Sequence, residues 1–174
     1  MIADSPGSID LYRALTPRWA FTPLSGAGAA KAGGRFNRQG LEALYLSLDA
    51  ATAIAEYQQT SQRLPPLTLC EYRATLPALV DLRRLEEGQW DSIWQDWACD
   101  WRASLFEHHI EPSTWTMGDM VLDAGYSGII FPSLAHPGGT NVVLYLDTLQ
   151  QAGGTIAIND PDGRLPKDDS SWHP

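Results

Sequence analysis

The segment from Leu44 to Gln59 constrains the fold most, because its pattern predicts a strand that passes directly into a helix. Leu44–Leu48 is a short apolar run typical of a strand. Asp49 follows as an N-cap for a helix through the letters AATAIAEYQQ, and the pair Pro65–Pro66 closes the unit. The chain is therefore expected to combine a sheet with helices.

Further strands are expected on both sides of this unit, because short apolar or alternating runs recur between turn-forming residues. The candidates are Ile9–Leu15, Leu67–Leu76, Leu79–Leu82, Gly128–Phe131, Asn141–Leu146 and Thr155–Ile158. Between the first strand and Leu44, the small-residue stretch Ser25–Gly34 follows Pro17 and Pro23, so we expect a long loop without regular structure there.

The most regular helical pattern in the chain is rich in tryptophan. Apolar residues recur at spacings of three and four, which predicts one helix with a broad apolar face. They are Trp90, Ile93, Trp94, Trp97, Trp101 and Leu105. We expect this face to pack in the core or at a protein interface rather than to bind a ligand. A further helix is predicted from Ser113, as its N-cap, to Ala124, with Gly125 as its C-cap.

Length and composition indicate one domain. A chain of 174 residues with 44% hydrophobic residues can form a single core, which we assign to residues 1–158. Residues 159–174 are mostly polar, Gly and Pro, and are expected to form a flexible tail. Cys70 and Cys99 do not have the spacing of a disulfide framework or a zinc site, so both are expected to be reduced thiols.

The charge and the N-terminal sequence limit the partners and the compartment. A formal net charge of −9, without a run of Lys or Arg, argues against direct binding of nucleic acid. The N-terminus does not resemble a signal peptide and no segment is long enough to span a membrane, so we expect a cytoplasmic protein without membrane contact.

Several familiar motifs fail in this sequence. Gly26–Lys31 starts like a dinucleotide fingerprint but has Lys in place of the third glycine and follows a loop. His108 and His109 are adjacent, and on a helix they would point about 100° apart, so a shared metal is not expected. Ser133 and His136 suggest a hydrolase, but FPSLA lacks the glycines of a nucleophile elbow.

Three polar residues remain as candidates, although each alone has a structural explanation. Arg35 follows two glycines, which let a backbone approach a ligand, and its guanidinium suits phosphate or ribose. Tyr45 lies in the predicted strand, where core packing is the usual role. Glu56 borders the buried face of an Ala/Ile-rich helix and could form a structural ion pair with Arg35.

The order of motifs along the chain, YR, GGRFN, ALYLS, ATAIAEY, FPS and NVVLY, resembles the RES-domain family from Leu11 to about Leu146. This resemblance implies an α+β fold, with a compact ADP-ribosyltransferase-like, curved, mainly antiparallel β core and flanking helices. It also implies NAD as a consumed substrate and no metal. The implied catalytic residues are Glu56, Arg35 and Tyr45, and the implied NAD-binding residues are Arg13, Gly34, Ser133 and Asn141.

The resemblance further implies a toxin of a type II toxin–antitoxin system that cleaves the nicotinamide–ribose bond. ADP-ribose would pass to a protein such as phosphoribosyl-pyrophosphate synthetase; the alternative is hydrolysis or phosphorolysis that depletes NAD. The expected partner is a cognate, DNA-binding antitoxin that blocks the site. Glu56 would stabilise an oxocarbenium-like ribose, Tyr45 would flank nicotinamide, and Arg35 and Arg13 would bind pyrophosphate or ribose.

Two other classes of function stay open from the sequence. One is a non-enzymatic protein-binding module that uses the Trp-rich helix. The other is a serine hydrolase centred on Ser133.

Overall fold

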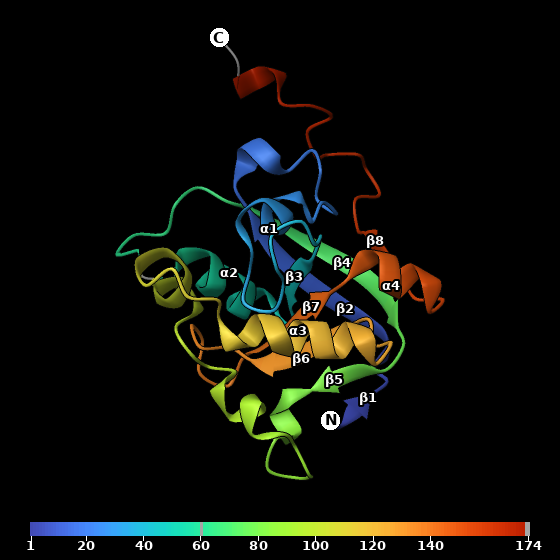
Figure 1. Ribbon diagram of the computed structural model, residues 1–174. Coiled ribbons are helices and arrows are strands. Elements are labelled where there is room, and N and C mark those ends of the chain that lie inside the picture. Colours follow the sequence, from blue (N-terminus) through green and yellow to red (C-terminus); the bar gives the residue numbers. More distant parts are fainter. Residues whose placement is uncertain (60, 173–174) are drawn as a thin grey trace.

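The computed structural model describes residues 1–59 and 61–172, and its centre is an eight-stranded sheet in the order β1-β5-β6-β7-β3-β2-β4-β8 (Figure 1). The β5–β6 pair is parallel and every other neighbouring pair is antiparallel. The strands are β1 Ala3–Asp4, β2 Gly7–Leu15, β3 Leu44–Ser47, β4 Thr68–Leu76, β5 Leu79–Asp81, β6 Gly128–Pro132, β7 Thr140–Leu144 and β8 Thr155–Ile158. Seven of them were expected from the sequence; β1 and its pairing with β5 at the sheet edge were not.

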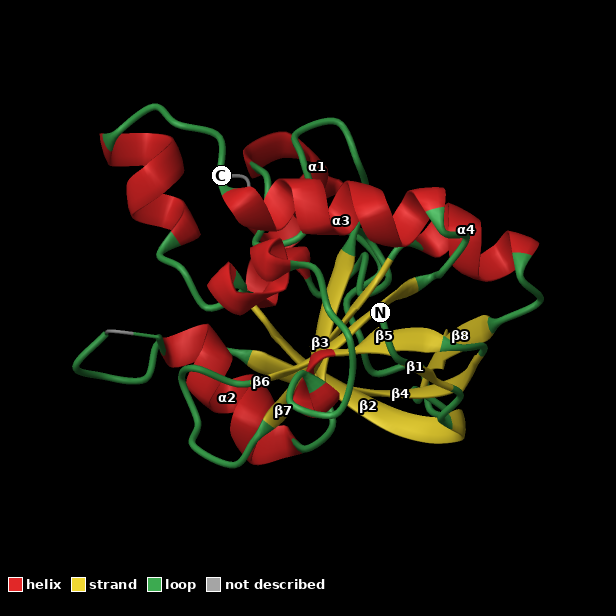
Figure 2. Ribbon diagram, turned by 60° about the horizontal axis from the view of Figure 1, so that its bottom comes forward, coloured by secondary structure: helices red, strands yellow, loops and turns green. Residues whose placement is uncertain are grey.

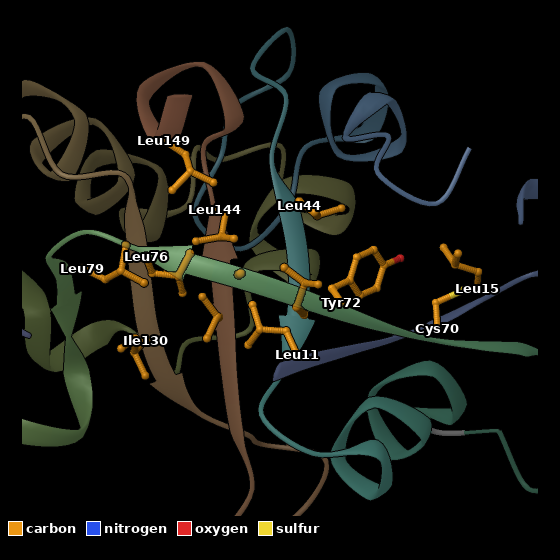
Figure 3. Close-up of a cluster of buried hydrophobic side chains, with 13 residues drawn as sticks. Leu11, Leu15, Leu44, Cys70, Tyr72, Leu76, Leu79, Ile130, Leu144 and Leu149 are labelled. Atoms are coloured by element: carbon orange, nitrogen blue, oxygen red, sulfur yellow. The ribbon is translucent and has the colours of Figure 1, made fainter. Parts of the chain in front are cut away.

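Successive residues of the central strands enter two different cores, because side chains alternate across a sheet. In β7, Val142 and Leu144 lie in one core and Val143 lies in the other. The first core consists mainly of leucines and includes Tyr72 of β4 (Figure 3). Leu149 of the C-terminal half packs in the same core. The second core places Met117 and Val121 against β6 and β7. Strands buried on both faces explain the continuous apolar runs in β6 and β7.

The helices are α1 Ala27–Ala32, α2 Ala50–Gln58, α3 Ser113–Asp123 and α4 Leu146–Gln151. The predicted cap of α2 is confirmed, since the Asp49 carboxylate accepts a hydrogen bond from the Thr52 amide at 2.8 Å. In Figure 2, α3 and α2 lie on opposite sides of the strands, which fan out between them as a strongly twisted sheet does. The expected fold class, an α+β fold with a mainly antiparallel sheet and flanking helices, is confirmed.

The Trp-rich region is not the single helix that its spacing predicted. It forms a 3-10 helix at Ser92–Asp96, a break, and then a π-helical turn at Ala103–Glu107. Trp94 is fully buried and Trp101 is 7% exposed, whereas the side chain of Phe106 is 54% exposed. A spacing of three suits a 3-10 helix as well as an α-helix, so the apolar pattern predicted burial correctly and helix type wrongly.

Three smaller expectations were also wrong. The small-residue stretch contains a short helix, α1, which begins after Gly26 and ends at Gly33. The strand expected over Asn141–Leu146 ends at Leu144 and gives way to α4 at Leu146. Ser113 is the first residue of α3 rather than its cap, and its hydroxyl instead donates to the Asp96 carboxylate at 2.5 Å.

The segment after β8 contacts the rest of the fold at a few residues, among them Asn159, whose amide donates to the Glu71 carbonyl at 2.8 Å. The Asp160 carboxylate accepts from the amides of Arg164 and Leu165, and Leu165 packs against the first core. The expected flexibility of residues 159–174 stays a prediction, and residues 173–174 lie outside the described part of the chain.

Candidate active site

A cavity of about 540 Å³ lies between β2, β3, α1, α2 and the segment that follows Trp97. Six of the seven residues named from the sequence line it: Arg13, Gly34, Arg35, Tyr45, Glu56 and Asn141. The seventh, Ser133, lies just outside the lining and contacts Glu56 directly. The structure therefore brings residues from positions 13 to 141 together around one space.

Glu56 is the centre of a hydrogen-bond network that joins α2 to two strand ends. Its Oε1 accepts from the Ser133 hydroxyl at 2.7 Å and from the Asn141 side-chain amide at 2.5 Å. Asn141 is in turn oriented by Ser47, whose hydroxyl donates to Oδ1 at 2.8 Å. Ser47 was missed by the sequence analysis, although its position opposite Asn141 in the β3–β7 register explains the contact. The other oxygen of Glu56, Oε2, accepts no hydrogen bond from a described residue.

Ser133 does not have the surroundings of a hydrolytic nucleophile. Its hydroxyl donates to Glu56 and accepts from the backbone amides of Ala135 and His136. The His136 ring lies elsewhere, with Nδ1 2.8 Å from the Thr52 hydroxyl. The Ser–His hydrogen bond that a triad requires is therefore not formed, and the hydrolase hypothesis loses its geometric basis.

Tyr45 links the cavity wall to the second core. Its hydroxyl donates to Asn37 Oδ1 at 2.8 Å and accepts from the Phe36 amide at 2.9 Å. Burial raises the pKa of the Tyr45 phenol well above its ordinary value, so the phenol stays neutral. Gly34 lies against it: a Cβ at this position would be 2.6 Å from the Tyr45 hydroxyl, which explains why glycine is required. Asn37 was not predicted; its side-chain Nδ2 lies 3.0 Å from each of three backbone carbonyl oxygens, those of Ala29, Arg38 and Leu41.

Tyr45→Phe is expected to destabilise the protein by about 1–3 kcal/mol, because it leaves the Phe36 amide without an acceptor. Urea unfolding followed by circular dichroism measures the difference. Tyr126→Phe is the matched control, since the Tyr126 hydroxyl donates to no described residue, and it should change the free energy of unfolding by less than about 0.5 kcal/mol. Equal stability of the two variants would contradict the structural role of Tyr45.

Arg35 forms hydrogen bonds with the backbone of the segment after Trp97, which forms the far wall of the cavity. Its Nη1 donates to the carbonyl oxygens of Trp97 and Cys99, each at 2.8 Å. Burial lowers the pKa of the guanidinium, although the group stays charged at neutral pH. The structural ion pair with Glu56, which was the alternative explanation of these two residues, is not formed between the side chains. Arg35 thus holds the wall in place while its remaining nitrogens stay available.

Arg13 has a similar arrangement on β2. It lies on the strand face of Leu11 and Leu15, and its Nη1 donates to the carbonyls of Pro23 and Ser25, each at 3.1 Å. These bonds fix the loop that leads into α1. Arg13 borders the cavity but lies on the opposite strand face from Tyr12, whose neighbour in the register is Ser47.

Residues 1–59 and 61–172 contain no cluster of three or more metal-ligating side chains. Within the same residues, no helix is long and apolar enough to cross a bilayer.

Comparison with known proteins adds to this picture. The sequence pattern of the RES domain matches residues 10–168, so the chain belongs to the RES-domain family. A chain in the crystal structure of the M. tuberculosis MbcT–MbcA toxin–antitoxin complex has the same fold, with a TM-score of 0.62 and 19% sequence identity. The alignment covers 91% of this chain and 88% of that chain. No curated protein matches the sequence significantly.

Proposed function

We propose that this protein is the toxin of a toxin–antitoxin system, and that it binds NAD and cleaves the bond between nicotinamide and ribose. The observation that carries the proposal is the Glu56 network: a carboxylate at a cavity wall, held through one oxygen by Ser133 and Asn141. Membership of the RES-domain family and the toxin–antitoxin fold neighbour support the same conclusion.

The proposed chemistry needs negative charge beside the ribose. Loss of neutral nicotinamide leaves positive charge on C1′ and the ring oxygen, and a fixed carboxylate stabilises that charge. Because Ser133 and Asn141 fix Oε1, the second oxygen of Glu56 keeps a defined direction and can bind the ribose hydroxyls. Tyr45 would flank the departing ring, since it lines the same cavity as a neutral phenol.

Transfer of ADP-ribose to a protein is the outcome we propose, and phosphoribosyl-pyrophosphate synthetase is one candidate acceptor. Hydrolysis or phosphorolysis of NAD is the alternative, because all three reactions share the same oxocarbenium-like state and differ only in the nucleophile. The cavity opens to the surface beside Leu134, which is 55% exposed, and Phe106, so an acceptor can approach it.

A cognate antitoxin that covers this opening is the proposed partner, and the fold neighbour's structure is itself that of a toxin–antitoxin complex. We propose that the antitoxin carries the DNA-binding function, since the toxin has a formal net charge of −9. Action on cellular NAD would place the protein in the cytoplasm.

The binding-module hypothesis is less well supported, because the continuous tryptophan face on which it depends is not formed. Trp94 and Trp101 are buried, and the segment between them is broken.

The direct test is to incubate the purified protein with NAD and to measure free nicotinamide, with and without cell extract. We expect release of nicotinamide, and with NAD labelled in its adenylate part we expect label on a protein of the extract. Loss of NAD without labelled protein would contradict transfer and favour hydrolysis or phosphorolysis. No release under either condition would contradict the proposed activity.

A further inference from the structure

The cavity has the opposite charge to the chain as a whole. Its lining contains three guanidinium groups, those of Arg13, Arg35 and Arg102, and one carboxylate, that of Glu56. The excess of positive charge is notable in a protein with a formal net charge of −9. A cavity with this balance of charge favours an anionic ligand, and the two negative charges of a diphosphate would neutralise the excess.

Two of the three arginines are already used to hold the backbone. Arg35 and Arg13 each donate from Nη1 to two carbonyl oxygens, so both hydrogens of that nitrogen are occupied. Burial lowers the pKa of both groups. They can contribute positive charge to the cavity, but their planes are fixed by the chain segments that they hold.

Arg102 is different, because it forms no hydrogen bond or ion pair with any described residue. Its Cζ lies 4.6 Å from the centroid of the Trp101 ring, and that ring is almost fully buried. A cation–π contact of this kind holds a guanidinium over an aromatic face without using its N–H groups, which stay available for a ligand. Phe106, with its ring centroid 6.2 Å from that of Trp101, supports the indole from the same segment.

We infer that Arg102, held on the face of Trp101, binds the diphosphate of the dinucleotide at the mouth of the cavity. This inference rests on the proposed function, since it takes NAD as the substrate. It assigns the diphosphate chiefly to Arg102 and leaves Arg13 and Arg35 as groups that build the walls. The planar fork of Arg102 matches two phosphate oxygens, which a lysine would contact only as a point charge.

The test is isothermal titration calorimetry with ADP-ribose, which contains the diphosphate and has no nicotinamide to lose. The variants are Arg102→Met, which keeps an apolar stem over Trp101, and Arg102→Lys, which keeps the charge. Arg164→Met is the matched control, because Arg164 is an exposed surface arginine outside the cavity lining. Circular dichroism checks that all four proteins are folded.

We expect Arg102→Met to weaken ADP-ribose binding about tenfold or more. The affinity of Arg102→Lys should lie between those of Arg102→Met and the wild type, and the control should match the wild type. Added salt should weaken binding by the wild type more than binding by Arg102→Met. Equal affinity of Arg102→Met and wild type, or no ADP-ribose binding by the wild type, would overturn the inference. Nicotinamide release from NAD by the wild type is measured in parallel. If Arg102→Met weakens ADP-ribose binding but the wild type releases no nicotinamide, the proposed reaction is contradicted and the assignment of Arg102 is not.

Discussion

Glu56→Gln is expected to reduce nicotinamide release from NAD by at least about a hundredfold while leaving the fold intact. The amide oxygen can still accept from Ser133 and Asn141, so the network around Oε1 is kept while the negative charge beside the ribose is lost. The effect should appear in kcat rather than in KM, because the charge is needed mainly in the transition state.

Glu86→Gln is the matched control for this experiment. Glu86 is an exposed carboxylate outside the cavity lining, and its loss changes the net charge by the same amount. Activity of Glu56→Gln within a few-fold of the Glu86→Gln value would contradict the role of Glu56 in the reaction. Expression in bacteria gives a second measurement: the wild type should stop growth, and Glu56→Gln should relieve this effect.

Gly118→Ala is expected to lower the free energy of unfolding by about 3 kcal/mol and the Tm by about 10 °C. A Cβ at Gly118 would lie 2.1 Å from the carbonyl oxygen of Phe36, so α3 must move away from the second core. The same carbonyl accepts from the Tyr145 hydroxyl at 2.7 Å, and that hydrogen bond would be lost as Phe36 shifts. Differential scanning calorimetry measures the change.

Gly28→Ala provides the comparison, because a Cβ at Gly28 in α1 meets no atom within 4 Å. This variant should be as stable as the wild type or up to about 1 kcal/mol more stable, since alanine favours a helix over glycine. Similar Tm values for the two variants would show that α3 does not pack on Phe36 as closely as described.

The strand-to-helix unit around Asp49 could be predicted from the sequence because its signals are local. An apolar run, an N-cap and an Ala-rich helix follow one another within a few residues, and the structure keeps all three. The prediction of a single helix for the Trp-rich segment was wrong for the opposite reason, because the structure of this segment depends on distant contacts. Its residues are buried by contacts with distant elements, such as the Arg35 side chain that holds the carbonyls of Trp97 and Cys99, and local spacing carries no information on such contacts.

The residues around the cavity were named from the order of family motifs, and the structure adds their geometry. The contact between Glu56 and Asn141 joins positions 85 residues apart, which periodicity cannot predict. Ser47 and Arg102 were missed because a serine in a strand and an arginine after a tryptophan have no distinctive pattern. Their roles emerge only from the β3–β7 register and from stacking on Trp101.

The position of β7 between β6 and β3 has a consequence for synthesis of the chain. β3 and α2 are synthesised long before β7. Asn141 of β7, whose side chain orients Glu56, is therefore absent when α2 first emerges from the ribosome. Contacts between residues so far apart in the sequence also close long loops, which slows folding. On the proposed function, the nascent chain would therefore be inert until Ser133 and Asn141 have been made and β7 has paired with β3.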